Sequence, residues 1–305
     1  MARSAKFRPP VPVICVGNFV VGGAGKTPTA IALAHRARNL GFRPGFLAPG
    51  YGGSARGPLL VTAEHRSADV GDEPLLLAAV APTAVGRDRA ASARLMLDHG
   101  INLIIMDDGF QNPSLAKDIT LVCVDAGAGS GNGLVLPAGP LRAPLDVQLQ
   151  RSDALLVIGD GDRAEPLVRT AARQGRSVLR AMLRPRRASK WRNTSVLAFA
   201  GIGRPAKFFE SLDAAGVSVI KTAAFPDHHR YTAADASRLI ADADRQGLRL
   251  VTTEKDRVRL AGEDGPLADL RQRAEAFPVA LDFDNPVAID EMIAEAGRKA
   301  ATATG

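Results

Sequence analysis

Nine short, unbroken apolar runs, alternating with stretches of helical spacing, are the feature that most constrains the fold of this chain. Unbroken hydrophobicity predicts strands that are covered on both faces, as in parallel sheets. The runs lie at residues 11–18, 45–50, 101–108, 119–125, 154–159, 195–202, 217–221, 248–253 and 278–283. Helices are expected between them, at 26–40, 88–99, 163–174, 206–215 and 233–246. This order of strand and helix predicts a doubly wound α/β architecture.

The alternation is interrupted by a basic, proline-containing stretch, residues 184–194. We predict that this stretch is a hinge between two α/β lobes. A chain of 305 residues has room for two domains, because a domain typically takes about 150 residues. We therefore expect a core domain over residues 1–187 and a smaller α/β domain over residues 188–305.

Composition and charge exclude several classes of protein. The chain is 46% hydrophobic and 23% charged, which argues against disorder. No apolar run reaches the roughly 18 residues that a membrane-spanning helix needs. Cys15 and Cys123 lie in apolar runs, so we expect buried thiols in a reducing compartment. The net charge of +7 is compatible with nucleic acid, anionic lipid, a phosphorylated substrate or a solvated surface. The main basic cluster lies in the stretch of residues 184–194. Trp191 is the one aromatic residue within it, so nucleic acid is not favoured as a binding partner.

The strongest chemical signal is GNFVVGGAGKTPTA, residues 17–30, between the first strand and the first long helix. A phosphate-binding loop needs glycines that turn amide N–H groups toward an anion, a lysine for the outer phosphates and a hydroxyl beside Mg²⁺. These parts are Gly22, Gly23, Gly25, Lys26 and Thr27. The usual pattern has a further glycine where this chain has Val20, so the loop is a variant. The alternative is a glycine-rich turn without a ligand.

Two carboxylates, Asp107 and Asp108, end the apolar run at 101–108. In a phosphate-loop protein, an acid at the tip of such a strand orients Mg²⁺, directly or through water. The alternative is a strand end that is capped by an Asp. Together with Lys26 and Thr27, the pair favours binding of a nucleotide with Mg²⁺.

Other segments leave alternatives open. Asp72 and Glu73 precede Pro74, and bare physics favours a role for these acids at a helix N-terminus. FPDHHRY, residues 225–231, is a poor metal set, so its histidines are either oriented by a carboxylate or exposed in a turn. Lys255 of TTEKD could pair with a phosphate or cap a helix.

Taken together, the motifs closely resemble the tetraacyldisaccharide 4′-kinase family. They are, in order from about residue 11 to about residue 260, GNFVVGGAGKTPT, GYGG, GDEPLLLA, DDGFQN, GNGLVLPAGPLR, FAGIGRPAKFF, FPDHH and TTEKD. Members of that family also lack the first glycine of the phosphate loop, so Val20 agrees with the resemblance.

The resemblance implies transfer of the γ-phosphate of ATP to the 4′-hydroxyl of a tetraacyldisaccharide 1-phosphate, a step of lipid A biosynthesis. It implies an α/β fold with two P-loop-NTPase-like α/β/α lobes, largely parallel sheets and a hinge. It further implies ATP and Mg²⁺ as cofactors and a peripheral position on the cytoplasmic face of the inner membrane. Neither nucleic acid nor an obligate protein partner is expected.

Site residues follow from the same resemblance. Thr27, Asp107 and Asp108 are expected to hold Mg²⁺. Asp72 matches the proposed base, and His228 matches its partner across the cleft. The residues expected to contact ATP are Val21, Gly22, Gly23, Ala24, Gly25, Lys26, Thr27, Pro28 and Gln111.

A physical argument supports the same pair, Asp72 and His228. A sugar hydroxyl is a very weak acid, and a lone exposed Asp, with a pKa of about 3.9, is a poor base at neutral pH. A histidine bonded to Asp72 could hold it in place and share the proton. If the two lie on different lobes, lobe closure assembles the site and limits wasteful ATP hydrolysis.

The sequence departs from the family pattern in three places. Ala143 stands where many relatives have Glu, and Asn112 where His is frequent. Relatives usually carry a longer, partly apolar N-terminal segment, whereas ten residues, including Arg3, precede the first strand here. Either the chain is trimmed, or basic and apolar surface elsewhere contacts the membrane.

Two other functions fit the bare motifs. One is a P-loop ATPase or GTPase switch without a lipid acceptor, which would not need a base and a histidine from another lobe. The other is an anion- or nucleic-acid-binding module, which would bind DNA in a salt-sensitive way without ATP turnover.

Overall fold

The computed structural model describes residues 6–304, so Arg3 lies outside the described residues. Its strands are β1 (Val13–Asn18), β2 (Pro44–Ala48), β3 (Leu59–Leu60), β4 (Thr83–Val85), β5 (Leu103–Asp107), β6 (Ile119–Asp125), β7 (Ala154–Ile158), β8 (Ser177–Pro185), β9 (Ser195–Ala200), β10 (Ser218–Ala224), β11 (Arg249–Thr252), β12 (Glu275–Ala276) and β13 (Val279–Phe283). Its helices are α1 (Lys26–Asn39), α2 (Ser67–Val70), α3 (Asp72–Ala78), α4 (Arg89–Asp98), α5 (Leu145–Gln150), α6 (Glu165–Arg173), the 3-10 helix η1 (Ala188–Trp191), α7 (Pro205–Ala214), α8 (Ala233–Gln246), α9 (Glu254–Arg259), α10 (Pro266–Arg273) and α11 (Pro286–Thr304).

The first lobe is built on a nine-stranded sheet in the order β13-β8-β7-β6-β1-β5-β2-β4-β3. Its central strands are parallel, and β3 and β13 pair antiparallel with their neighbours. Successive residues of β1 face opposite cores: Ile14 packs with residues of α1, α3 and α11, and Cys15 with residues of α4, α5 and α6. This burial on both faces is the reason why the central strands are apolar throughout.

The second lobe is a smaller sheet in the order β10-β9-β11-β12, with parallel pairing throughout. Phe199 of β9 packs on one face with residues of α8 and α10, and Ala198 packs on the other with residues of α7. Both lobes are therefore helix–sheet–helix layers. The two-lobe α/β class predicted from the sequence is confirmed.

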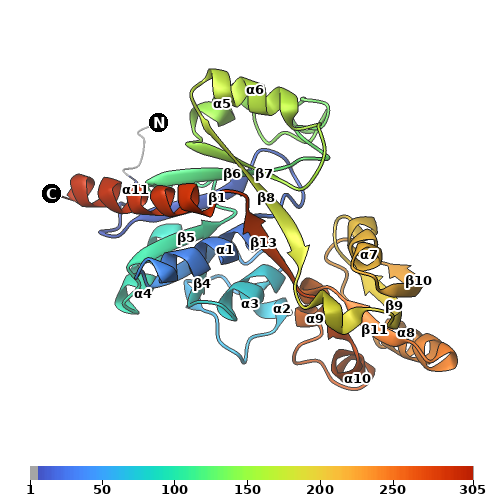
Figure 1. Cartoon of the computed structure of the whole chain (residues 1–305). Coiled ribbons are helices and arrows are strands. Elements are labelled where there is room, and N and C mark those ends of the chain that lie inside the picture. The colour runs from blue at the N-terminus through green and yellow to red at the C-terminus, as the bar shows by residue number, and fades with distance from the viewer. Residues whose placement is uncertain (1–5, 305) are drawn as a thin grey trace.

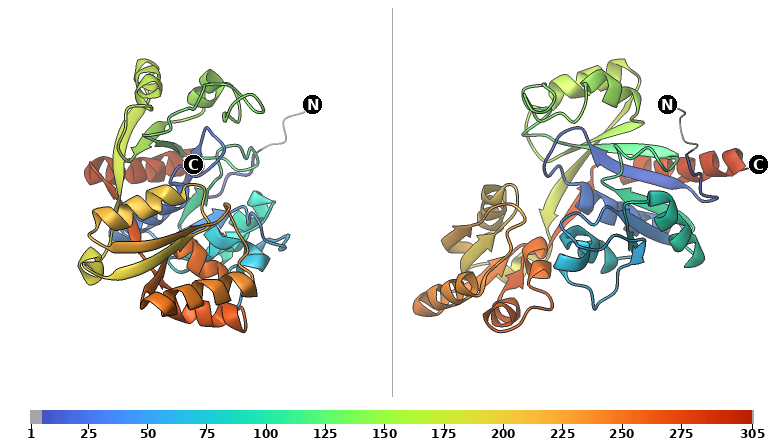
Figure 2. Two further views of the ribbon diagram at one scale, coloured as in Figure 1. Left: turned by 90° about the vertical axis from the view of Figure 1, so that its right-hand side faces the viewer. Right: turned by 180° about the vertical axis from the view of Figure 1, so that it is seen from behind.

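Two neighbouring strands connect the lobes (Figures 1 and 2). The chain leaves the first sheet through β8 and η1, close to the predicted hinge at residues 184–194. It returns through β13, which pairs antiparallel with β8 from Val279↔Pro185 to Phe283↔Ala181. Helix α11 then covers the first sheet, where Ile289 and Ile293 are fully buried. The expected assignment of all of residues 188–305 to the second domain is therefore wrong for 279–304, because these residues bury their apolar side chains in the first lobe.

Most predicted elements are present, with ends that differ from the predicted ones by up to three residues. The sequence does not predict strand β8, SVLRAMLRP, because this segment contains two arginines and its side chains are only partly buried. Arg180, Arg184, Arg186 and Lys190 of the basic cluster pair with Glu165, Asp282 or Glu275. Both cysteines are buried and free as expected, and burial raises the pKa of Cys15 to about 11. Among the described residues, no helix is long and apolar enough to cross a bilayer.

Candidate active site

The glycine-rich loop joins the buried strand β1 to helix α1, as the sequence predicts. Gly25 precedes the helix with φ of +79°, in the left-handed region that favours glycine. A Cβ at Gly25 would lie 2.8 Å from Ile158 Cδ1, so a side chain there would also clash. The loop therefore lies directly before the N-terminus of a 14-residue helix. Proteins use this arrangement to bind phosphate.

The acidic tip of β5 lies directly beside this helix. Thr27 donates its hydroxyl to Asp107 Oδ2 at 2.8 Å, and Lys26 Nζ lies 3.8 Å from Asp108 Oδ1. Burial raises the pKa of Asp107 to about 6 despite the Thr27 hydrogen bond and the charge of Lys26. Asp107 Oδ1 and Asp108 Oδ1 are buried without a hydrogen-bond partner. Two orphaned carboxylate oxygens beside a hydroxyl form a donor set that suits Mg²⁺.

Arg142 and Gln111 complete the rim of the loop. Arg142 Nη2 lies 3.6 Å from Asp108 Oδ2, and its Nε donates to the Val20 carbonyl at 3.3 Å. Gln111 donates to the Asn18 carbonyl at 3.0 Å. Gln111 therefore supports the strand that leads into the loop.

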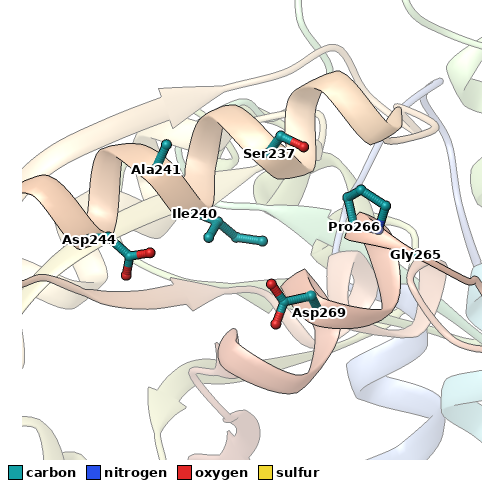
Figure 3. A pocket seen from close by; sticks show the side chains of 7 residues that line it. All are labelled: Ser237, Ile240, Ala241, Asp244, Gly265, Pro266 and Asp269. Atoms are coloured by element: carbon teal, nitrogen blue, oxygen red, sulfur yellow. The ribbon is translucent and has the colours of Figure 1, made fainter.

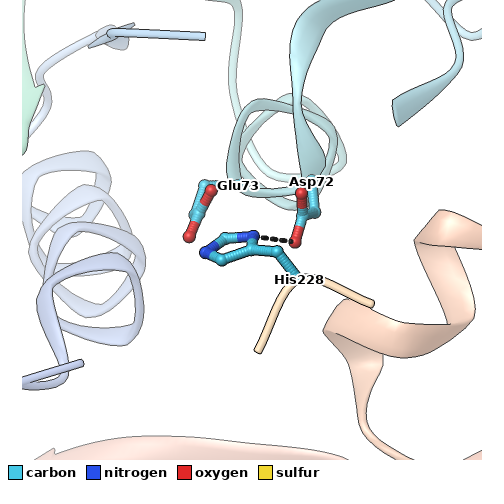
Figure 4. Close-up of side chains that lie close together, drawn as sticks. All are labelled: Asp72, Glu73 and His228. Carbon is cyan, nitrogen blue, oxygen red and sulfur yellow. Dashed lines mark hydrogen bonds and ion pairs between the residues drawn. The ribbon is translucent and has the colours of Figure 1, made fainter. Parts of the chain in front are cut away.

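The predicted pair of Asp72 and His228 forms across the two lobes. Asp72 is the first residue of α3 in the first lobe, and His228 lies in the loop after β10 in the second. His228 Nδ1 lies 3.2 Å from Asp72 Oδ2, and the dashed line in Figure 4 marks this contact. His228 has φ of +56°, which is rare for a residue with a side chain and is a form of strain found at functional sites.

A third residue, which the sequence argument missed, holds Asp72 from the second lobe. Arg259, the last residue of α9, donates to Asp72 Oδ2 from Nε at 2.8 Å and from Nη2 at 2.5 Å. Burial alone would raise the pKa of Asp72, but the charge and hydrogen bonds of Arg259, with Lys255 and His228, lower it. The sequence contains only an indirect signal for this contact: an arginine three residues after Asp256 on a short helix, where the two side chains can pair.

Glu73 forms a second cross-lobe ion pair, with Lys255. The sequence left open whether Lys255 pairs with a phosphate or caps a helix. In the structure Lys255 contacts a carboxylate of the other lobe. Ligand atoms of Asp72, Glu73 and His228 lie within 4.8 Å of one another, a spacing that could suit a metal. Each carboxylate, however, is already paired with a cation of the second lobe, so a metal there would compete with Arg259 and Lys255.

Asp125, at the end of β6, makes a third contact between the lobes. It pairs with Arg204, the residue before α7, and accepts from Lys207 Nζ at 2.9 Å. Arg204 also donates to the Gly23 carbonyl of the phosphate loop at 3.3 Å. The second lobe thus contacts the phosphate loop itself. Neither the motif of the loop nor the motif that contains Arg204 predicts this contact by itself.

The structure places the predicted site residues in two groups. The residues of 21–28 form the loop and helix start, with Asp107 and Asp108 beside Thr27, and Asp72 meets His228. Glu73, adjacent to Asp72, lies close enough to Asp107 for its charge to contribute to the raised pKa of that carboxyl. The adjacent His229 is held apart, stacked on Phe225 at 4.7 Å and bonded to Asp235 at 3.1 Å.

The two residues that depart from the family pattern, Ala143 and Asn112, make local contacts, the first through its backbone alone. Ala143 accepts a hydrogen bond from Gln148 Nε2 through its carbonyl at 2.7 Å. Asn112 accepts from the Ser114 amide at 3.0 Å and hydroxyl at 2.7 Å, which closes a turn. Neither contact involves the acids of β5.

A hollow in the second lobe, between α8 and α10, is shown in Figure 3. It lies on the face of the second sheet opposite α7, the helix whose Lys207 contacts Asp125 of the first lobe. Its lining contains two carboxylates and no basic residue, so it does not suit a phosphate. The lining residues are Ser237, Ile240, Ala241, Asp244, Gly265, Pro266 and Asp269.

Comparison with known proteins identifies the family. The family model described as tetraacyldisaccharide-1-P 4′-kinase matches residues 2–297. The chain belongs to this family. A tetraacyldisaccharide 4′-kinase of Methylobacterium nodulans is 56% identical over 280 residues, which cover 91% of this chain and 81% of the relative. Another, of Chelativorans sp., is 50% identical over 299 residues, covering 96% and 87%.

A solved structure supports the fold. The "apo" form of LpxK from Aquifex aeolicus, crystallised in complex with ATP, matches with a TM-score of 0.73 and 24% identity, covering 96% of this chain and 90% of that one. The family resemblance of the motifs and the predicted kinase class are confirmed. The switch ATPase without a lipid acceptor is not favoured.

Proposed function

We propose that this chain transfers the γ-phosphate of ATP to the 4′-hydroxyl of a tetraacyldisaccharide 1-phosphate and forms the 1,4′-bisphosphate. The observation that carries the proposal is the Asp72–His228 contact across the lobes, which holds a carboxylate of one lobe against a histidine of the other. A nucleotide switch has no need for such a pair, whereas a kinase with a hydroxyl acceptor does. The similar proteins of Methylobacterium nodulans and Chelativorans sp. are tetraacyldisaccharide 4′-kinases, which supports the same acceptor.

ATP would lie with its phosphates in the loop of residues 21–28. The amides at the N-terminus of α1, which the loop directly precedes, would bind the phosphates, and Lys26 would reach the outer ones. Thr27, Asp107 and Asp108 fit a divalent ion, because two buried carboxylate oxygens there have no hydrogen-bond partner. When bound, Mg²⁺ would neutralise charge that develops on the transferred phosphoryl group.

The second lobe would supply the acceptor side of the reaction. The 4′-hydroxyl oxygen forms a bond to the γ-phosphorus while the bond from that phosphorus to the bridging oxygen of ADP breaks. The hydroxyl proton passes to Asp72, and His228 holds the carboxylate and shares the proton. Since Asp72 and His228 belong to different lobes, the pair is complete only when the lobes are together.

The direct test combines labelled ATP, Mg²⁺ and tetraacyldisaccharide 1-phosphate with the full chain. We expect a labelled bisphosphate product that is absent when the acceptor already carries a 4′-phosphate. Equal ATP hydrolysis with and without acceptor, and no labelled lipid, would instead support the nucleotide switch.

We also propose that the protein works peripherally on the cytoplasmic face of the inner membrane. Val20, Leu141 and Val135 lie on adjacent extended segments and face the core. Side chains alternate along extended chain, and Val21, Leu134 and Leu136 are 54%, 51% and 52% exposed. We call these three residues the apolar cluster.

The apolar cluster is continuous with the phosphate loop, because Val21 precedes Gly22. Single exposed apolar residues are common, but a group of them marks an interaction surface. The acyl chains of the proposed substrate must remain in a bilayer while the sugar reaches the loop. The position of the apolar cluster therefore supports contact with the membrane surface at this side of the site.

A further inference from the structure

Arg259 is a buried cation that spans the two lobes. Its side chain is 5% exposed and contacts two carboxylates, Asp72 of the first lobe and Asp256 of its own helix. Burying a guanidinium is costly unless its donors are satisfied. Nη1 donates to Asp256 Oδ1 at 2.7 Å and to the Gly201 carbonyl at 2.5 Å, while Nε and Nη2 are directed at Asp72.

The second lobe holds one side of this guanidinium through its own residues. Asp256, which is fully buried, accepts at Oδ1 from the Tyr231 hydroxyl at 2.9 Å and from the Gly201 amide at 3.0 Å. Its Oδ2 accepts from Thr253 Oγ1 at 2.6 Å. Each of these partners belongs to the second lobe, so Nη1 of Arg259 is held through contacts within its own lobe.

The contacts of Asp72 are concentrated on one oxygen. His228 Nδ1 and both donors of Arg259 converge on Oδ2. Three donors occupy the lone pairs of that oxygen, which leaves Oδ1 as the oxygen that can accept a proton from the substrate. The orientation of the carboxylate is therefore set by two groups of the other lobe, a histidine and an arginine.

We propose that Arg259 is a positioning residue of the phosphoryl transfer, which fixes Oδ2 of Asp72 so that Oδ1 faces the acceptor hydroxyl. This inference rests on the proposed function. In it, the pair of Asp72 and His228 is one part of a three-residue arrangement that forms when the lobes meet. Arg259 touches neither substrate nor reacting atoms, and it acts through Asp72.

The charges around Asp72 predict a second consequence. The groups that face it are Glu73 on its own helix, Arg259 and Lys255 on α9, and His228. Among these, Arg259 contributes most to lowering the pKa of Asp72 against the effect of burial. Without Arg259 the pKa rises, so the ionised form is lost at a higher pH.

The experiment compares Arg259→Gln, Arg259→Lys and Arg259→Ala in the full chain, with ATP, Mg²⁺ and tetraacyldisaccharide 1-phosphate. We expect kcat to fall about 10²-fold in the Gln and Ala variants, the cost of a misplaced reacting group, with KM for ATP little changed. The acid limb of kcat/KM should move to higher pH in Arg259→Gln. Arg259→Lys should retain more activity, and added guanidinium should partly restore Arg259→Ala.

The matched control is Arg257→Gln, on the same helix, because Arg257 contacts the Ala274 carbonyl within the second lobe. It should keep the wild-type kcat and pH profile. Near-normal kcat in Arg259→Gln would overturn the proposal. So would equal losses in the Lys and Gln variants together with no response of Arg259→Ala to guanidinium, since a purely structural role predicts that result. Failure of the wild type to phosphorylate the lipid is a separate outcome and would refute the proposed function instead.

Discussion

At the scale of single residues, the site depends on side chains that are buried and yet ionisable. Asp72 is buried beside Arg259, and Asp107 is buried beside Thr27. The two environments have opposite effects: the pKa of Asp72 is lowered, and that of Asp107 is raised to about 6. The difference arises because a buried guanidinium is bonded to Asp72, whereas Asp107 has only a hydroxyl and a more distant lysine.

The pair of Asp72 and His228 can be tested by truncation. Asp72→Ala or His228→Ala should lower kcat by about 10²-fold or more, because proton transfer loses its acceptor or the group that holds it. The affinity for ATP, measured by calorimetry, should change little. The control is His229→Ala, because His229 bonds Asp235 inside the second lobe. Near-normal kcat in both dyad variants would remove the pair from the mechanism.

The ion pair of Asp72 also predicts a pH dependence of stability. The pKa of Asp72 in the folded state lies below its ordinary value, so the ionised form favours folding. This contribution is present above the unfolded pKa of about 3.9 and is lost as pH falls through the folded value. Asp72→Asn should therefore reduce the free energy of unfolding by about 2 kcal/mol at pH 7, and by progressively less as the pH falls below the unfolded pKa of about 3.9. Urea unfolding at pH 7 and at a series of pH values below that pKa measures this, and a difference that stays constant down the series would contradict it.

At the scale of elements, parallel pairing explains why the chemistry lies at one edge. Strands β1, β5 and β6 are parallel neighbours, so the phosphate loop, Asp107 and Asp125 all follow carboxyl ends of strands. Ligands of open α/β sheets bind at this edge. The extended segments that contain Val20, Val135 and Leu141 pair with one another beside the phosphate loop, and they carry the apolar cluster.

The apolar cluster can be tested by removing its apolar side chains. Leu134→Ser with Leu136→Ser should reduce flotation with vesicles of anionic and zwitterionic phospholipid several-fold, because less apolar surface enters the bilayer. ATP affinity should stay unchanged. Ile220→Ser with Val287→Ser is the matched control, since these side chains are 55% and 62% exposed on other elements. Equal flotation of both double variants would exclude the apolar cluster as the membrane contact.

At the scale of the whole molecule, two strands connect the lobes, and among residues 6–304 three ion-paired contacts that involve a lysine or an arginine join them. They are Arg259 with Asp72, Lys255 with Glu73, and Arg204 and Lys207 with Asp125. Each contact places an acid of the first lobe against a base of the second. The arrangement favours a closed form by charge rather than by an apolar interface, so closure should respond to salt.

The contact at Asp125 provides a test of closure. Asp125→Asn should weaken the closed form by about 1 kcal/mol, roughly a fivefold change in population. The radius of gyration measured by small-angle scattering without nucleotide should increase, and kcat should fall. Asp290→Asn serves as control, because Asp290 pairs with Arg36 inside the first lobe. An unchanged radius in Asp125→Asn would show that this contact does not hold the lobes together.

The sequence by itself determined the local features: the apolar runs that become strands, the glycine loop before α1 and the acids at the end of β5. These follow from hydrophobic spacing and backbone preference within short segments, which act before any tertiary contact exists. It also identified Asp72 and His228, although only through the order of motifs, because bare physics favoured a helix-capping role for Asp72.

Only the tertiary structure decided which charges meet. Arg259 lies 187 residues from Asp72, and Arg204 lies 79 residues from Asp125; no spacing rule relates such positions. The return of β13 and α11 to the first lobe is of the same kind, since an apolar helix can cover either sheet equally well in sequence terms. An unpaired buried charge and an uncovered apolar face both cost free energy. Which distant groups pair depends on where these costs are greatest, and those places are set by the folded chain.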